Sequence, residues 1–339
     1  MNPPAYRPHR SSAGFWIVIV LLVLGLGASL FLNIGLAAAL FGKSASAFTD
    51  TDAGVDEFPQ LQEVWSYGDG DVKAVRIALT GVIMREGDDG LFAAPQDRIA
   101  MIEAQIRAAQ NDDDVKAIIL EVDSPGGGIT PSDELYRALM GFKESATGRV
   151  VVVFMRDLAA SGGYYVAMAG DWLIAEPTTV VGSIGVIMQS LNLKGLSEKL
   201  GVRDVTIKSG ANKDLLNPFN DVPPEQLALL QGMIDSMYEH FVGIVARSRS
   251  IELGELKKLA DGRIFVAHEA LDLKLVDQIG YWDDVLARTA AMLDVDQVKV
   301  VRYEHHTDFF EWFSSMRSSL KPSSWLDLHR PRLLYLWQP

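Results

Sequence analysis

The sequence of 339 residues predicts an α/β protein built around a mainly parallel sheet. Three observations lead to this fold class. Short runs of β-branched and other apolar residues recur along the middle of the chain, as in buried strands. Longer segments with helical spacing separate these runs, and two of the runs end in glycine-bearing turns. Alternation of strands and helices is typical of parallel sheets, because parallel neighbours need a crossover connection.

The expected elements follow one another regularly from residue 72 onward. We expect strands at 72–84, 115–123, 149–155, 171–177 and 205–210, and helices at 97–111, 131–143, 193–201 and 224–249. A short helix is expected directly after Ala160, and further helices, broken by Gly262 and Gly280, within 253–293.

Two of these helices have clear apolar stripes. In 97–111 the stripe is Ile99, Ile102, Ile106 and Ala109. In 224–249 it is Leu227, Leu230, Ile234, Met237, Phe241 and Val245. We expect both stripes to pack in the core. The helix at 131–143 has Pro131 and acidic residues at its start, which is a typical helix beginning.

Composition excludes several function classes. The chain has no cysteine, which removes disulfides, thiolate nucleophiles and cysteine-ligated zinc. No cluster of His, Asp and Glu shows metal-ligand spacing, so neither a metal nor a cofactor is expected. The net charge of −13 argues against a nucleic-acid partner.

The N-terminus predicts a membrane anchor. Residues 15–41 contain no ionisable side chain and exceed the roughly 20 residues that span a bilayer core as a helix. Arg7 and Arg10 precede the segment and acidic residues follow it, which places residues 1–14 in the cytoplasm and everything beyond about residue 42 on the far side of the membrane. The alternative is a cleaved signal peptide with a small-residue site after Ala47, but the apolar run is long for one.

The two glycine-bearing turns are the candidate chemical site. One is DSPGGG at 123–128 and the other is AASGG at 159–163, and each follows a buried strand. In a parallel sheet both turns lie at the same edge, where ligand sites form. Glycine amides near Ser161 could form an oxyanion hole for a serine nucleophile. Neither turn matches a phosphate-binding loop.

A serine nucleophile needs a base, and the residues alone leave its identity open. His240 and His268 fall in helical patterns and are not excluded. Lysine is the other option, provided that its ordinary pKa of about 10.4 falls by roughly 3 units. Lys208 and Lys213 both lie in the loop that follows the strand expected at 205–210.

Five spaced motifs resemble the short bacterial signal peptide peptidases of serine peptidase family S49. They are SPGGG, AASGGYY, VGSIGVIMQS, KSGANKD and ADGRIF, in this order. The resemblance covers roughly residues 72–290 and implies a Clp protease/crotonase-like α/β fold with a Ser–Lys dyad. It places the nucleophile at Ser161 and the base at Lys213 rather than Lys208.

The resemblance also implies the supporting residues. The oxyanion donors would be the amides of Gly127 and Gly162, and Ser183 would hydrogen-bond the lysine. Gly163 is expected to let its helix pack closely on the sheet, and Tyr164 and Tyr165 are expected to pack rather than to catalyse.

The resemblance implies a membrane-anchored serine endopeptidase that degrades remnant signal peptides and other extended apolar chains. It also implies a homo-oligomer without metal or nucleic acid. The domains expected are a cytoplasmic N-terminus (1–14), a signal anchor (15–41), a linker (42–71), the S49 peptidase domain (72–293) and a C-terminal extension (294–339). Two rivals remain: an acyl-CoA hydratase or thioesterase on the same fold, and an inactive membrane scaffold.

The segment RPRLLYLWQP, residues 330–339, contains five consecutive apolar residues. Such a run is costly to leave in water, so we expect it to be docked. It could pack on the outside of its own domain or a neighbour. It could instead lie in an apolar substrate cleft, because it resembles an extended apolar substrate.

Overall fold

The computed structural model describes residues 19–33, 61–85, 97–305 and 333–337. Contacts divide the chain into two units, Met1–Glu57 and Phe58–Pro339. In the first unit, residues 19–33 are helical. No helix among the described residues is both long and apolar enough to cross a membrane. The anchor expected at 15–41 extends beyond the described residues at both ends and stays a prediction.

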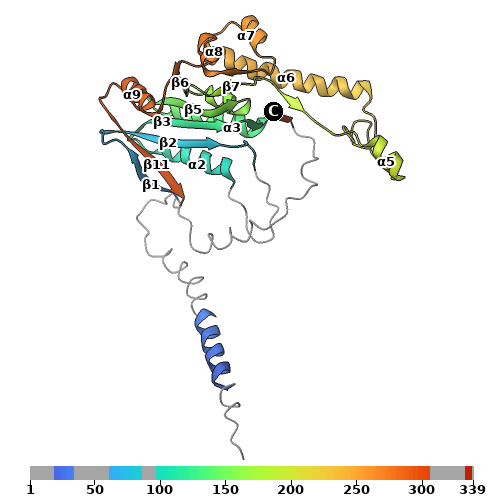
Figure 1. Cartoon of the computed structure of the whole chain (residues 1–339), viewed down its shortest axis with the longest axis horizontal. Coiled ribbons are helices and arrows are strands. Elements are labelled where there is room, and N and C mark those ends of the chain that lie inside the picture. Colours follow the sequence, from blue (N-terminus) through green and yellow to red (C-terminus); the bar gives the residue numbers. More distant parts are fainter. Residues whose placement is uncertain (1–18, 34–60, 86–96, 306–332, 338–339) are drawn as a thin grey trace, which may run out of the picture. The chain divides into compact units, whose positions relative to one another are not determined.

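The second unit contains the strands and the remaining helices (Figure 1). Its strands are β1 (Leu61–Tyr67), β2 (Val72–Thr80), β3 (Val115–Ser124), β4 (Gly126–Gly128), β5 (Val150–Ala160), β6 (Trp172–Ala175), β7 (Val180–Gly182), β8 (Ile187–Met188), β9 (Ile264–Val266), β10 (Gln278–Ile279), β11 (Val298–His305) and β12 (Leu333–Leu336). Its helices are α2 (Arg98–Asn111), α3 (Ile129–Ser145), α4 (Gly162–Ala167), α5 (Lys194–Leu200), α6 (Pro224–Arg249), α7 (Leu253–Leu259), α8 (Ala267–Asp272) and α9 (Trp282–Met292).

The main sheet is α/β and mostly parallel, as the alternation predicted. Its order is β1-β11-β2-β3-β5-β6-β10, and every neighbouring pair from β11 to β10 is parallel. The first part of β5 pairs with β6, whereas its last residues, Leu158–Ala160, pair with β7. The strand therefore continues past the predicted end at residue 155 and runs directly into Ser161.

Helices cover both faces of the sheet, which explains the continuous apolar strands. Val151, Val153 and Met155 point into the core cluster that α2, α3, α4 and α6 share. Val152 and Phe154 point into a second cluster with α9. A strand buried on both faces needs apolar residues at every position rather than at alternate ones.

Helix α2 confirms the prediction closely. It begins after Asp97, whose side chain accepts a hydrogen bond from the amide of Ile99, and it ends at Asn111. Its buried residues are the four predicted ones, Ile99, Ile102, Ile106 and Ala109.

The core prediction for α6 was only half right. Leu230, Phe241 and Val245 are buried, but Leu227 is 52% exposed. The N-terminal half of α6 and helix α5 belong to a projection that we call the arm, residues 191–233 (Figure 1).

The strand predicted at 205–210 is wrong. These residues form no strand, and the side chains of Val205 and Ile207 are 85% and 97% exposed. Their β-branched character favours a strand, but within the described part of the chain no strand pairs with them.

Parts of the expected linker and of the expected C-terminal extension form strands of the main sheet. Strand β1 lies within the range expected to be a linker and pairs antiparallel with β11. Strand β11 lies within the expected C-terminal extension and pairs parallel with β2. Both segments are therefore part of the same compact unit as the rest of the sheet.

Candidate active site

Ser161 stands at the turn from strand β5 to helix α4. Its φ of 52° and ψ of −116° are unusual for a residue with a side chain, and its amide donates to the carbonyl of Gly182 at 2.8 Å. The residue is 1% exposed, and its hydroxyl does not cap the helix. A sharp, strained strand-to-helix turn of this kind holds a nucleophilic hydroxyl away from its own helix.

The two glycines expected to supply the oxyanion hole lie next to each other. A Cβ on Gly162 would stand 3.1 Å from the amide nitrogen of Gly127 and 2.6 Å from the hydroxyl oxygen of Ser132. A Cβ on Gly127 would stand 2.0 Å from the carbonyl oxygen of Ile83. Neither position has room for a side chain, so the backbone of Gly127 packs directly against Gly162, the residue that follows Ser161.

Gly163 has a different role. A Cβ there would stand 2.8 Å from the carbonyl oxygen of Ser124, at the end of β3. This contact confirms the expected close packing of the helix on the sheet. Tyr164 is fully buried and donates to the carbonyl of Leu275 at 2.7 Å, which fits its predicted packing role.

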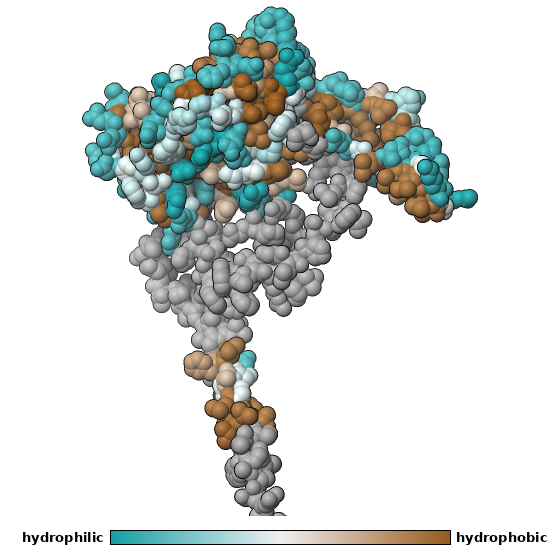
Figure 2. Space-filling model, in the orientation of Figure 1, coloured by the Kyte–Doolittle hydropathy of each residue, from teal (hydrophilic) through white to brown (hydrophobic). Residues whose placement is uncertain are grey.

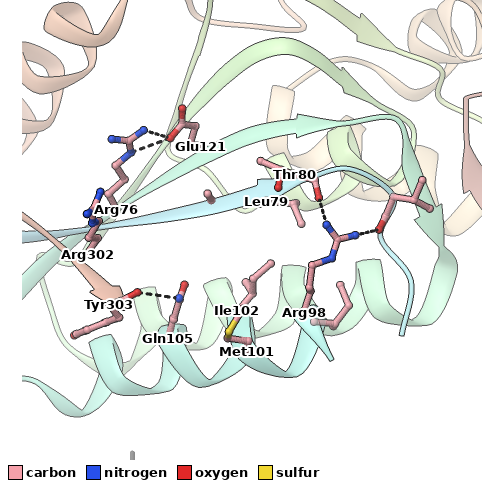
Figure 3. A pocket seen from close by; sticks show the side chains of 13 residues that line it. Arg76, Leu79, Thr80, Arg98, Met101, Ile102, Gln105, Glu121, Arg302 and Tyr303 are labelled. Carbon is pink, nitrogen blue, oxygen red and sulfur yellow. Dashed lines mark hydrogen bonds and ion pairs between the residues drawn. The ribbon is translucent and has the colours of Figure 1, made fainter. Parts of the chain in front are cut away.

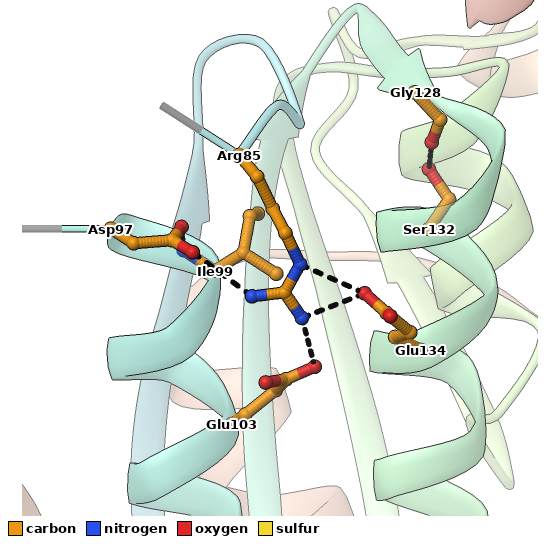
Figure 4. A network of polar contacts seen from close by, with 7 residues as sticks. All are labelled: Arg85, Asp97, Ile99, Glu103, Gly128, Ser132 and Glu134. Carbon is orange, nitrogen blue, oxygen red and sulfur yellow. Dashed lines mark hydrogen bonds and ion pairs between the residues drawn. The ribbon is translucent and has the colours of Figure 1, made fainter. Parts of the chain in front are cut away.

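Strand β4, which carries Gly127, is held firmly along one edge. Ile83 donates to the carbonyl of Gly126 at 2.8 Å and accepts from the amide of Gly128 at 2.7 Å. Two residues after Ile83, the guanidinium of Arg85 forms ion pairs with three carboxylates (Figure 4). Asp97, at 2.9 Å, precedes α2, and Glu103, also at 2.9 Å, lies in α2. Glu134, at 2.7 Å, lies in α3. Arg85 therefore fixes the segment that supports β4.

The other edge of β4 pairs with β12. Strand β12 lies between β4 and β8 and is antiparallel to both, in a separate three-stranded sheet. Without β12, the two edges would face each other across a gap one strand wide. Residues 333–336 of the segment expected to be docked therefore lie in β12 between these two edges, where an extended peptide could add as a strand, and the rest of that segment lies outside the described residues.

Ser161 lines a cavity of about 550 Å³. Ser183 lines the same cavity, and so do Leu336 and Trp337 from the segment that ends β12. Ser183 follows β7, has a φ of 51°, and its amide donates to the carbonyl of Arg263 at 2.7 Å. The structure thus brings together Ser161, Ser183, Gly127 and Gly162 from three separate segments.

The structure does not bring Lys213 to this cavity within one chain. Lys213 is exposed on the arm and is not among the lining residues. Lys208, the other arm lysine considered, binds Asp214 at 2.7 Å. Two histidines were left as possible bases by the sequence. The Nε2 atom of His240 lies 3.7 Å from a carboxylate oxygen of Asp133, and His268 is exposed. Neither histidine lines the cavity.

Lys257 is the lysine that lines the cavity, and sequence reasoning missed it. Its ammonium group binds Glu239 at 2.6 Å, and this hydrogen bond raises the pKa of Lys257 above its ordinary value. A raised pKa keeps the amine protonated, which is the wrong state for a base. No sequence signal sets this lysine apart from other helical lysines.

A second cavity, of about 360 Å³, lies between β2 and α2 and does not contain Ser161 (Figure 3). Its arginines have partners: Arg76 binds Glu121 at 2.5 Å, Arg98 donates to two backbone carbonyls, and Arg302 pairs with Glu304. With its arginines engaged inside the protein, this cavity offers little to an anionic ligand.

Comparisons with known proteins agree with the motifs. The family model described as peptidase family S49 matches residues 143–296. The chain is similar to a putative signal peptide peptidase SppA of Enterococcus faecium, with 37% identity over 74% of this chain and 72% of that protein. It is 41% identical to a putative protease of Synechocystis over 54% of this chain and 66% of that protein. It is 35% identical to a chloroplastic serine protease, SPPA, of Arabidopsis thaliana over 52% of this chain and 26% of that protein.

Proposed function

The chain belongs to peptidase family S49 and is a serine peptidase, and on this premise we propose that it is a membrane-anchored endopeptidase for extended apolar peptides, remnant signal peptides among them. The observation that carries the proposal is the antiparallel pairing of an extended strand, β12, between β4 and β8, with Ser161 in the cavity that Leu336 and Trp337 also line. A peptide that pairs with both edges is extended, and an extended backbone exposes its carbonyls to attack.

In the proposed reaction, the hydroxyl oxygen of Ser161 attacks the scissile carbonyl carbon. The amides of Gly127 and Gly162 donate hydrogen bonds to the oxyanion that forms. Lys213 takes the serine proton and then gives it to the leaving amine, so that an acyl-enzyme remains. A water molecule hydrolyses this ester and restores the Ser161 hydroxyl. Ser183 orients the amine of Lys213.

We propose that Lys213 reaches the cavity from the arm of a second copy of the chain. Two observations support this arrangement. Lys213 is exposed and does not line the cavity of its own chain. The arm that carries it exposes many large apolar side chains, visible as brown surface in Figure 2: Leu191, Leu196, Leu200, Val202, Val205, Ile207, Leu227, Leu229 and Met233. An apolar surface of this extent is typical of a protein interface.

Labelling with a serine-reactive fluorophosphonate tests the function. We expect the detergent-solubilised full chain to be labelled at Ser161 and to hydrolyse a fluorogenic apolar peptide. Ser161→Ala should lose both properties. Failure of the wild-type protein to react and to hydrolyse would favour a scaffold, and coenzyme A binding in its place would favour the acyl-CoA class of enzyme.

The proposed location follows from the segment at 15–41. We propose that it spans the membrane once, with residues 1–14 in the cytoplasm and the catalytic unit outside it. Protease added to spheroplasts should then degrade the catalytic unit. Degradation only in inverted vesicles would mean that the orientation is reversed.

A further inference from the structure

The motif ADGRIF, residues 260–265, takes no part in the reaction steps above, but it borders the Ser161 cavity. The Asp261 carboxylate closes a tight turn there. One of its oxygens accepts from the backbone amide of Arg263 at 3.1 Å and from the Nε of the same residue at 2.8 Å. The other oxygen accepts from Nη2 of Arg263 at 2.5 Å. One carboxylate therefore holds both the backbone and the side chain of Arg263.

The carbonyl of Arg263 in turn holds Ser183. The Ser183 amide donates to this carbonyl at 2.7 Å, at the point where β9 begins and Ile264 pairs with Gly182 of β7. Ser183 has a φ of 51°, a strained conformation that persists only where surrounding bonds impose it. The position of Ser183 therefore depends on the Asp261 turn, through the backbone of Arg263.

Gly182 extends this series of hydrogen bonds to Ser161. The carbonyl of Gly182 accepts from the Ser161 amide at 2.8 Å, and Gly182 pairs with Ala160 of β5. Gly182 has a φ of 103°, and a Cβ on it would stand 3.1 Å from the carbonyl oxygen of Arg263. The two serines are thus held in order along the chain of strands β9, β7 and β5, and Ser183 is the nearer one to the turn.

We propose that Asp261 is a positioning residue for the peptidase reaction: through Arg263 it fixes Ser183, which orients the catalytic lysine. The carboxylate of Asp261 engages Arg263 and needs no contact with the substrate to act in this way. This proposal rests on the proposed peptidase function and adds a residue to its machinery.

The exposure of the Asp261–Arg263 pair separates this role from a general structural one. The two side chains are 51% and 53% exposed, and an ion pair as exposed as this contributes little to stability. The hydrogen bond from the Arg263 side chain lowers the pKa of Asp261 to about 2, so the carboxylate stays ionised at the neutral pH of an activity assay. Loss of the carboxylate should therefore affect the site more than the fold.

Substitutions at Asp261 in the full chain in detergent test the proposal. Asp261→Ala removes the acceptor and should lower kcat for a fluorogenic apolar peptide by about tenfold, with KM within about twofold. Asp261→Asn keeps an oxygen that can accept from the Arg263 amide, and it should retain at least about a third of the wild-type kcat. Both variants should melt within about 3 °C of the wild type.

Glu255→Ala is the matched control. Glu255 is an exposed acid in α7 that pairs with Lys258 at 2.7 Å, and it is not among the residues that line the cavity. Its loss removes an exposed ion pair of the same kind without touching the Asp261 turn. We expect kcat and KM to stay at their wild-type values.

A double-mutant cycle decides whether Asp261 acts through Ser183. In a Ser183→Ala background, Asp261→Ala should lower kcat by less than about twofold, because the hydroxyl that it positions is already gone. If turnover of Ser183→Ala is too slow to follow, the rate at which a fluorophosphonate labels Ser161 is the readout. The same tenfold loss in both backgrounds would overturn the proposal.

The other outcomes separate the positioning role from the function. Asp261→Ala with wild-type kcat, or with a melting temperature that falls together with kcat, would overturn the positioning role and leave the peptidase function intact. Equal losses in Asp261→Asn and Asp261→Ala would also overturn it, because the charge and not the turn would then matter. A wild-type preparation that neither hydrolyses the peptide nor reacts with the fluorophosphonate would contradict the peptidase function itself.

Discussion

Ser161 and Ser183 both have a positive φ, which is a strained backbone conformation for a residue with a side chain. Both have φ near +50°, and both line the same cavity. A non-glycine residue in this region costs of order 1–3 kcal/mol, which the surrounding strands must offset. The amide of each residue donates to a strand or loop carbonyl, of Gly182 and of Arg263, and these bonds hold the two turns in place. Backbone strain of this kind is common at functional sites, where the surrounding structure holds side chains in fixed positions.

The choice of base can be tested on three lysines. We expect Lys213→Ala to lower kcat/KM for a fluorogenic peptide by at least about 1,000-fold, because serine is a weak nucleophile without a base. Lys208→Ala on the same arm is the matched control and should retain most activity. Lys257→Ala should lower activity by only a few-fold, about threefold, since its pairing with Glu239 keeps it protonated. Near-complete loss in Lys257→Ala, with activity kept in Lys213→Ala, would assign the base to Lys257.

Asp133 accepts a hydrogen bond from the Tyr165 hydroxyl at 2.6 Å and should give a pH-dependent stability. Burial acts to raise the pKa of Asp133, but the hydrogen bond from Tyr165 and the ion pair with Arg137 outweigh it and hold the pKa below its ordinary value. A lowered pKa stabilises the fold above about pH 4, and this contribution is lost as the pH falls through the folded-state pKa. Asp133→Asn should therefore unfold about 1 kcal/mol more easily at pH 7.

The check is urea unfolding of both proteins at pH 7 and at the lowest pH where the wild type stays folded. The difference between wild type and Asp133→Asn should shrink at the lower pH. A difference that is the same at both pH values would mean that the carboxylate charge is not what stabilises Tyr165.

At the scale of helices and strands, the sequence predicted the features that depend on neighbouring residues in the chain. The four buried residues of α2 follow from apolar spacing, and its start follows from Asp97 as a cap. The run 149–155 predicted a buried strand, but not its continuation to Ala160, because that part depends on pairing with β7. The strand expected at 205–210 does not form, because none of the strands that the structure describes pairs with these residues.

The candidate site also combines residues that short motifs predict with contacts between residues far apart in the sequence. Short motifs indicated Ser161, Gly127, Gly162 and Ser183, and the structure brings these four together. The rings of Tyr165 and Tyr335 stack although the residues are 170 positions apart in the sequence, and no local sequence pattern predicts such a contact. Strands β1 and β11 pair across a still longer separation. For this reason the composition of the first segment predicted a linker, and the second, where the family resemblance ends, was expected to be an extension.

Strand β12 should compete with substrates, because it fills the gap between β4 and β8. Deleting residues 331–339 should lower the apparent KM for a leucine-rich peptide while kcat stays similar. If β12 occupies the gap for nine-tenths of the time, the apparent KM falls by about tenfold. An unchanged KM with a lower melting temperature or a broken oligomer would make β12 a structural strand and not an occupant of the cleft.

At the scale of the whole molecule, two features of the described residues support the proposed site between two chains. The arm exposes several large apolar side chains, of which Ile207 is 97% exposed. Lys213 lies on that arm, away from the lining of the Ser161 cavity. A neighbouring copy that covers the arm would bury this apolar surface, and it would bring the lysine of one chain to the serine of the next.

Mixing two inactive variants tests this arrangement. Ser161→Ala keeps Lys213, and Lys213→Ala keeps Ser161, so neither should hydrolyse peptides alone. If each site joins two chains, dissociating and reassociating equal amounts of the two should restore about one intact site in four. The control replaces Lys213→Ala with the double variant Ser161→Ala/Lys213→Ala, which carries no serine to complement and should restore nothing. If the mixture of single variants stays inactive although the two chains co-assemble, the lysine must reach the serine of its own chain, by a movement of the arm.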